Sequence, residues 1–208
     1  MCGIVAVYGS NNVVRDIYEA LTVLQHRGQD ASGILTNHDG KITLRKSLGL
    51  VRDGFDAKHI SRLQGKLGIG HVRYPTAGSN DVTDSQPFYT ASPVIISLAH
   101  NGTLTNSDNI RKGLLKSSFC QFNTTYDSDV LMKLLSYEIY STYFKKLGKT
   151  HIFKALKEVS KKCLGGYASV SIISGIGLVA FRDPNGIRPL SLGQKKDSYM
   201  VASESSAL

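Results

Sequence analysis

The sequence predicts an α+β fold with two largely antiparallel sheets, and three observations support this prediction. Strand-like and helix-like segments follow one another in the order strand, helix, strands, helices, strands, unlike the regular alternation of a parallel α/β fold. The dipeptide Asp39-Gly40 favours a tight hairpin between two strands. Short strand-like segments separated by turn residues make up the last part of the chain.

The first half of the chain is expected to alternate short strands with two helices. Residues 3–8 are apolar and rich in β-branched side chains, which predicts a buried strand. A helix is expected from Val13 or Val14, where apolar residues recur at helical spacing, with Asn11 or Asn12 as its cap. The remaining expected elements are a short helix at 58–63 and strands at 32–36, 41–46, 67–73 and 94–100.

The second half is expected to contain helices first and strands afterwards. Helical spacing of apolar residues predicts helices over 105–116 and 128–147. A third helix should place Cys163 on its apolar face, in the core, and end at Gly165-Gly166. The expected strands lie at 167–173, 177–182, 190–193 and 199–202.

Composition excludes several classes of protein. With 41% hydrophobic and 20% charged residues, the chain can bury a core, which argues against disorder. It contains no run of about eighteen apolar residues and no secretory leader, so we expect a cytoplasmic protein with no membrane partner. The net charge of +9 concentrates between Arg111 and Lys162. We interpret this region as a solvated face of helices rather than a nucleic-acid surface, because it carries no nucleic-acid-binding motif.

The cysteines point to chemistry at one position only. Cys2, Cys120 and Cys163 cannot all pair, and without a C-x-x-C motif neither a disulfide framework nor a metal site is expected. Removal of Met1 would make Cys2 the first residue. A thiol with a pKa of about 8.5 and an α-amine with a pKa of about 7.7–8.0 would then belong to one residue, which could act as nucleophile and base.

Segments along the whole chain resemble the class II glutamine amidotransferases, a family with an N-terminal cysteine nucleophile. These segments are MCGIVAV at 1–7, LQHRGQDASG at 24–33, GHVRYPTAG at 70–78, Gln86-Pro87, HNG at 100–102 and TYDSD at 125–129. Two more, FRDPNGIRPL at 181–190 and VASES at 201–205, resemble the amidophosphoribosyltransferase branch of that family. The resemblance implies the αββα four-layer sandwich of the N-terminal-nucleophile hydrolases.

The resemblance also assigns the reacting groups. Cys2 corresponds to the nucleophile, and Asn101 together with the backbone N–H of Gly102 corresponds to the oxyanion hole. His26 and Arg27 lie at a polar junction between a helix and a strand. We expect these two side chains to organise the site beneath the nucleophile rather than to react, because polar groups buried at a helix end need partners.

Free glutamine carries a carboxylate and an ammonium at one end, so its site needs a cation and an anion. By the resemblance, Arg73 binds the α-carboxylate, for which its planar fork is a bidentate match. Asp127 accepts hydrogen bonds from the α-ammonium. The loop at 74–87 collects Pro, Gly, Ser, Asn and Asp, and with Tyr74 and Thr76 it is expected to close over glutamine.

Each assignment has a plain structural alternative. Asn101-Gly102 is also the composition of a hairpin turn, and Asp127 also fits an ordinary helix N-cap. His71 and His100 are better interpreted as core or hydrogen-bonding histidines than as metal ligands. Tyr126 departs from the resembled family, which usually has a small hydroxyl residue there.

The implied activity is hydrolysis of L-glutamine to glutamate and ammonia through a Cys2 thioester. In the resembled branch, the ammonia reacts with phosphoribosyl pyrophosphate and gives 5-phosphoribosylamine, the first step of de novo purine (IMP) biosynthesis. That step needs a phosphoribosyltransferase domain with Mg²⁺, so we interpret residues 2–208 as a glutaminase domain truncated at its C-terminal end. We expect no cofactor in this fragment, no nucleic-acid partner, and a homo-oligomer at full length.

Two other functions stay open from the sequence. The chain could be the glutaminase module of another class II amidotransferase, although the segment at 181–190 argues against this. It could also be a non-catalytic basic binding module, against which the intact set of site residues argues. A retained Met1 would place the Cys2 nitrogen in a peptide bond and remove the proposed base.

Overall fold

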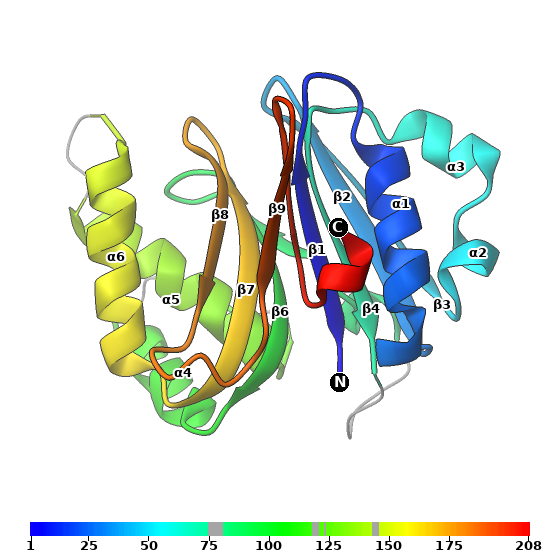
Figure 1. The fold of residues 1–208 in the computed structure, drawn as a ribbon. Helices are drawn as coiled ribbons and strands as arrows, with labels where there is room; N and C mark the ends of the chain where they lie inside the picture. The colour runs from blue at the N-terminus through cyan, green and yellow to red at the C-terminus, as the bar shows by residue number, and fades with distance from the viewer. Residues whose placement is uncertain (75–80, 118–120, 123, 143–145) are drawn as a thin grey trace.

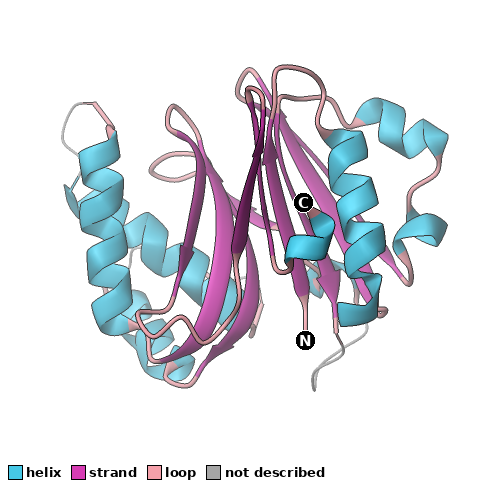
Figure 2. Ribbon diagram, in the orientation of Figure 1, coloured by secondary structure: helices cyan, strands magenta, loops and turns pink. Residues whose placement is uncertain are grey.

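The fold is a stack of four layers. The computed structural model describes residues 1–74, 81–117, 121–122, 124–142 and 146–208. In these ranges two antiparallel sheets pack face to face, and helices cover the outer face of each sheet (Figure 1). Figure 2 shows the resulting order of helix, sheet, sheet and helix. The predicted α+β class with two antiparallel sheets is therefore confirmed.

The larger sheet has the strand order β3-β2-β4-β1-β10-β9. Its strands are β1 (Gly3–Tyr8), β2 (Ala31–His38), β3 (Lys41–Leu48), β4 (Leu67–Arg73), β9 (Ser191–Lys195) and β10 (Ser198–Ala202). The β2–β3 hairpin turns at Asp39 and Gly40, whose φ angles of 49° and 87° suit a type I′ turn. The outer face is covered by α1 (Val14–Val23), α2 (Val51–Gly54) and α3 (Ala57–Arg62).

The smaller sheet has the strand order β5-β6-β7-β8. Its strands are β5 (Phe88–Thr90), β6 (Ile96–Leu104), β7 (Gly165–Ile173) and β8 (Gly177–Arg182). Its outer face is covered by α4 (Ser107–Lys116), α5 (Asp127–Thr142) and α6 (Lys149–Lys162). The short 3₁₀ helices are η1 (Leu24–Arg27), η2 (Val82–Asp84) and η3 (Ser205–Ala207).

The alternation of side chains along β1 shows how the core is built. Ile4 and Ala6 face the other sheet, whereas Val5 and Val7 face α1, because successive residues of a strand point to opposite faces. Burying one such aliphatic side chain stabilises the fold by about 1.5–3 kcal/mol. A strand at the centre of a two-sheet stack is therefore apolar throughout, as the sequence of β1 is.

Several predicted strands have the observed bounds, namely those at 3–8, 67–73 and 177–182. The predicted cap of the first helix is wrong, since the N-cap is Val13. Asn12 instead accepts hydrogen bonds from the N–H groups of Val14 and Gly65 at 3.4 and 3.2 Å. Its side chain therefore ties the start of α1 to the segment that leads into β4.

Other differences have local causes. The three residues of β5 and the four of α2 are too few to show a hydrophobic period. Residues 146–148 are not helical, so the helix predicted to reach 147 is too long. Gly165 and Gly166 do not end the third helix, because they already belong to β7. Cys163, which follows that helix, is buried in the core as predicted.

The loop expected at 74–87 is described only in part. Residues 75–80, and with them Thr76, lie outside the described residues. The part from 81 onward contains η2 and leads into β5. Within the described ranges, no helix combines the length and the hydropathy needed to cross a membrane.

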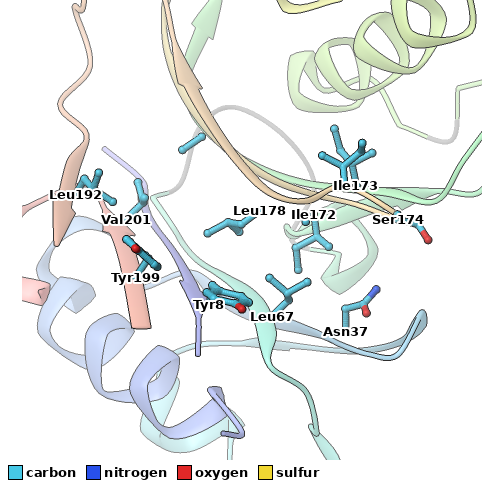
Figure 3. Close-up of a pocket in the computed structure, with 14 residues that line it drawn as sticks. Tyr8, Asn37, Leu67, Ile172, Ile173, Ser174, Leu178, Leu192, Tyr199 and Val201 are labelled. Carbon is cyan, nitrogen blue, oxygen red and sulfur yellow. The ribbon is translucent and has the colours of Figure 1, made fainter. Parts of the chain in front are cut away.

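A cavity of about 660 Å³ opens between the two sheets (Figure 3). Its lining is mostly apolar and includes Tyr8, Leu67, Ile172 and Leu178, which come from both sheets. Tyr8 is the last residue of β1, whereas Cys2 precedes the first. The cavity therefore lies at the opposite end of the strands from the predicted nucleophile.

Candidate active site

Strand register brings three predicted site residues to one end of the space between the sheets. Gly3 pairs with Val72, so Cys2 lies opposite Arg73, the last residue of β4. Ile4, Ile69 and Ala99 belong to the apolar cluster between the sheets. Because side chains on a strand alternate, those of Cys2, Arg73 and Asn101 point into the same space.

The Cys2 thiol is surrounded by charges and by a backbone donor. Burial raises the pKa of this thiol. A hydrogen bond from the backbone N–H of Tyr74 and the positive charges of the amino terminus and Arg73 lower it, while Asp127 raises it again. The net shift is upward, so the thiol is protonated at neutral pH and needs a base before it can attack.

Arg73 is held in a fixed orientation. It is only 5% exposed, and its Nη2 donates a hydrogen bond to the hydroxyl of Tyr126 at 2.9 Å. Its Nε lies 3.7 Å from a carboxylate oxygen of Asp30, and the guanidinium lies over the Tyr126 ring, 5.3 Å from the centroid. The unusual Tyr126 thus positions the cation that is predicted to bind the glutamine carboxylate.

Asn101 and Gly102 lie within β6, so the interpretation of this dipeptide as a hairpin turn is wrong. Asn101 is 2% exposed, and its Nδ2 has no hydrogen-bond partner among the residues that the structure describes. Gly102 has a φ of 148°, and a Cβ there would stand 2.1 Å from the carbonyl oxygen of Gly166. An oxyanion hole requires buried donors that are free to bind the oxyanion and a backbone that approaches the substrate closely. The Asn101 amide fits the first requirement, and a position that only glycine can occupy fits the second.

Asp127 is the first residue of α5, and its side chain binds the end of β6. Its Oδ2 accepts a hydrogen bond from the backbone N–H of Leu104 at 2.9 Å, at the end of β6. Its Oδ1 lies 3.8 Å from Nδ1 of His100. The carboxylate is therefore fixed next to the strand that carries Asn101, close enough to influence Cys2.

Arg27 binds the backbone of Cys2, as expected, whereas His26 does not contact the predicted nucleophile in the described structure. The Nε of Arg27 donates a hydrogen bond to the carbonyl oxygen of Cys2 at 2.9 Å, and its Nη1 donates to Glu204. The side chain of His26 is 59% exposed and contacts Glu204 at 3.1 Å. Glu204 thus links His26 to Arg27, and the hydrogen bond from Arg27 is the main cause that lowers the pKa of Glu204.

The two histidines near the site are buried, in line with their interpretation as core residues. Burial lowers the pKa of His71 to about 3, so its ring is neutral. Nδ1 of His100 lies 3.0 Å from the hydroxyl of Ser128, and burial lowers the pKa of His100 as well. In the described ranges, His, Cys, Asp and Glu side chains do not gather in groups of three or more that could hold a metal ion.

Glu204 and Arg188 were assigned no role from the sequence, and Tyr126 was noted there only as a departure from the resembled family. Tyr126 and Glu204 hold Arg73 and Arg27. Arg188, in the loop between β8 and β9, donates through Nη1 to the sulfur of Met1 at 2.7 Å. Glu204 and Arg188 both lie in segments that carry the family resemblance, which was the available signal.

Comparison with known proteins now decides the family. A model of the glutamine amidotransferase domain matches residues 71–208 of this chain. The chain belongs to the glutamine amidotransferase family. The buried Cys2 thiol, the Asn101 amide and the flanking charges therefore lie in a glutamine amidotransferase domain, and the fold is that of an N-terminal-nucleophile amidotransferase.

Three relatives of this glutamine amidotransferase domain carry the same name. The amidophosphoribosyltransferases of Pseudomonas aeruginosa and Escherichia coli are each 51% identical to it, over 100% of this chain. The amidophosphoribosyltransferase of Schizosaccharomyces pombe is 43% identical, also over the whole chain. The chain spans 42% of the length of the two bacterial proteins and 40% of the yeast protein.

Solved structures agree with this relationship. A glutamine phosphoribosylpyrophosphate amidotransferase from B. subtilis, complexed with ADP and GMP, superposes with a TM-score of 0.81 at 30% identity. A structure described as the allosteric regulatory enzyme of purine biosynthesis superposes with a TM-score of 0.84 at 32% identity. Both comparisons cover 99% of this chain and 42% of the other chain.

Proposed function

We propose that this chain is the glutaminase part of an amidophosphoribosyltransferase and that Cys2 attacks glutamine. The observation that carries the proposal is the convergence of a buried thiol, a fixed cation, a carboxylate and an unpaired amide donor at one end of the space between the sheets. Glutamine offers a complementary group to each of these: an amide carbon, an α-carboxylate, an α-ammonium and a developing oxyanion.

Recognition of the amino acid head uses the two charged residues. Arg73, oriented by Tyr126, donates its guanidinium fork to the α-carboxylate. Asp127 accepts from the α-ammonium while its other oxygen stays bonded to the Leu104 N–H. Tyr74, whose backbone N–H bonds the Cys2 thiol, and Thr76, outside the described residues, belong to the loop that covers the bound substrate.

The reaction begins once Met1 is removed and the Cys2 amine is free. The amine takes the thiol proton, and the sulfur attacks the side-chain amide carbon of glutamine. Asn101 Nδ2 and the Gly102 N–H donate to the oxyanion of the tetrahedral intermediate. The amine returns the proton to the leaving nitrogen, so ammonia departs and a thioester remains. Water, deprotonated by the same amine, attacks the thioester, releases glutamate and restores the thiol.

The remaining expectations concern the whole protein. In the proposed full-length enzyme, ammonia reacts with phosphoribosyl pyrophosphate and gives 5-phosphoribosylamine, with pyrophosphate as the leaving group. The names of the relatives support this step. Mg²⁺ would act in the phosphoribosyltransferase domain, and we propose a cytoplasmic homo-oligomer that binds no nucleic acid.

The test is intact mass together with a glutaminase assay on the purified chain, with Cys2→Ala as the control. We expect a mass lower by one methionine and a release of glutamate that Cys2→Ala abolishes. Ammonia production that is unaffected by Cys2→Ala would refute the assigned nucleophile. A correctly processed chain without any glutaminase activity would favour the non-catalytic binding module instead.

A further inference from the structure

Gln86 holds the backbone of β6 directly beside the proposed oxyanion donors. Its Oε1 accepts a hydrogen bond from the backbone N–H of His100 at 2.7 Å, and its Nε2 donates to the carbonyl oxygen of His100 at 3.2 Å. The residue is 8% exposed. Both polar atoms of the side-chain amide thus bind the main chain of one residue, the neighbour of Asn101.

The register of the small sheet explains why a side chain occupies this place. β5 pairs with β6 so that Phe88 lies opposite Leu98 and Thr90 opposite Ile96. Two residues further along, the same register places position 86 opposite His100. Pro87 has no N–H and interrupts the strand. The Gln86 amide has the same donor and acceptor as a peptide group, so it supplies the pairing that the strand would have made.

This pairing bears on the direction of the Gly102 N–H. Main-chain groups along an antiparallel strand point alternately to its two neighbours, so those of His100, Gly102 and Leu104 share one side. The N–H of His100 is bound by Gln86, and that of Leu104 is bound by Asp127. The residues on both sides of Gly102 are therefore held by side chains, and the Gly102 N–H lies between these two fixed points.

The other side of the Gln86 segment is held by the larger sheet. A Cβ at Gly33, in β2, would stand 2.1 Å from the carbonyl oxygen of Gln86 and 2.9 Å from Cδ of Pro87. The segment is therefore packed against the backbone of β2 and bonded to the backbone of β6. It links the two sheets at the end where Cys2 lies.

We propose that Gln86 is a positioning residue for the oxyanion hole. Its amide fixes the main chain of β6 so that the Gly102 N–H and the Asn101 amide meet the oxyanion that forms during attack on glutamine. Gln86 does not touch the substrate. The inference rests on the proposed glutaminase function, and it predicts that Gln86 acts on the chemical step rather than on binding of the glutamine head.

The test compares steady-state glutamine hydrolysis by Gln86→Met and wild type. Methionine has a similar length and makes neither hydrogen bond. We expect kcat to fall about tenfold to a hundredfold, since displacing a transition-state group by about 1 Å has effects of this size. KM should stay within about threefold, because Arg73 and Asp127 are unchanged. Gln86→Glu keeps the acceptor for the His100 N–H but places a carboxylate oxygen against the His100 carbonyl, so its kcat should fall as well.

Asn12→Leu is the matched control. The Asn12 amide makes the same kind of double contact at the other end of the strands, donating to the Leu63 carbonyl at 3.3 Å and accepting from the Gly65 N–H at 3.2 Å. Asn12 is more exposed than Gln86, and its loss removes a pair of side-chain hydrogen bonds without affecting β6. We expect the kcat of folded Asn12→Leu to stay within about twofold of wild type.

Amide hydrogen exchange gives a readout that does not depend on activity. The His100 amide should exchange at least about tenfold faster in Gln86→Met than in wild type, with the Ile4 amide unchanged. The inference is overturned if the kcat of both Gln86 variants stays within about threefold of wild type, or if His100 exchange is unaltered. A wild-type chain that is processed but releases no glutamate would instead refute the proposed function.

Discussion

Replacing Asn101 with alanine should separate catalysis from stability. Its Nδ2 is buried and finds no hydrogen-bond partner in the described part of the chain. An unpaired buried donor of this kind costs about 1–3 kcal/mol. Alanine removes that cost but loses part of the side-chain packing. We therefore expect the free energy of unfolding of Asn101→Ala to equal or exceed that of wild type, with a Tm that is unchanged or up to about 4 °C higher.

Catalysis should respond in the opposite direction. In the proposed reaction this amide donates to the oxyanion, and loss of one such donor costs about 2.7–4 kcal/mol, or about 10²–10³ in kcat. The assay is glutamate release as a function of glutamine concentration, combined with thermal unfolding of the same preparation. KM should change by less than about threefold, because the charged head of glutamine is bound elsewhere.

Asn37→Ala is the control for this experiment. Asn37 is also a buried strand asparagine, but its Oδ1 accepts a hydrogen bond from the Gly40 N–H at 3.1 Å. Alanine there removes a satisfied bond worth about 1 kcal/mol, so Tm should fall by about 2–4 °C while kcat is unchanged. If Asn101→Ala instead loses Tm like Asn37→Ala and keeps its kcat, Asn101 is a structural residue and the oxyanion assignment is wrong.

Three further predictions follow from the site. Arg73→Lys loses the guanidinium fork that binds the Tyr126 hydroxyl and is proposed to bind the α-carboxylate of glutamine. Steady-state kinetics should therefore show a KM for glutamine that is raised about tenfold to a hundredfold. An unchanged KM contradicts the assigned role. Burial raises the pKa of the Cys2 thiol, so its alkylation by iodoacetamide should titrate with a midpoint above 9.0, the upper end of the usual range of a free thiol. The stability that the protonated thiol contributes should be lost as pH rises from 9.0 through the raised pKa. A midpoint at or below 9.0 contradicts this prediction. Glu204→Gln leaves the buried Arg27 with a weaker partner, so thermal unfolding should show a Tm lower by about 3–6 °C. An unchanged Tm would mean that the ion pair between Arg27 and Glu204 contributes nothing to the free energy of unfolding.

Local patterns predicted the secondary structure well where a strand is buried or a turn is tight. β1 was predicted with its observed bounds because its run of β-branched residues has few alternatives in a core. The Asp39-Gly40 turn was predicted because only a few residues tolerate positive φ. Segments of three or four residues, such as β5, are too short to show a pattern that predicts a strand or a helix.

Contacts at the site between residues far apart in the sequence could not be predicted from local patterns. Asn101-Gly102 favours a turn by composition, yet pairing with β7 along its whole length keeps this segment in a strand. Arg27 and Glu204 are 177 residues apart, and their contact exists only because β1 pairs with β10. The bond between Asp127 and the Leu104 N–H likewise depends on how α5 packs on β6. Long-range pairings of this kind leave no mark on the spacing of residues.

Labelling by a reactive ketone analogue of glutamine tests the central claim most directly. The analogue is a chloromethyl ketone that carries the same α-carboxylate and α-ammonium, with its ketone carbon in the place of the amide carbon. The nucleophile displaces chloride from the neighbouring methylene and stays bound to it. Peptide mapping by mass spectrometry should find the label on Cys2 of a chain that lacks Met1, with labelling suppressed by excess glutamine and absent in Cys2→Ala. A label on another side chain, or none on a processed and folded chain, would contradict the account.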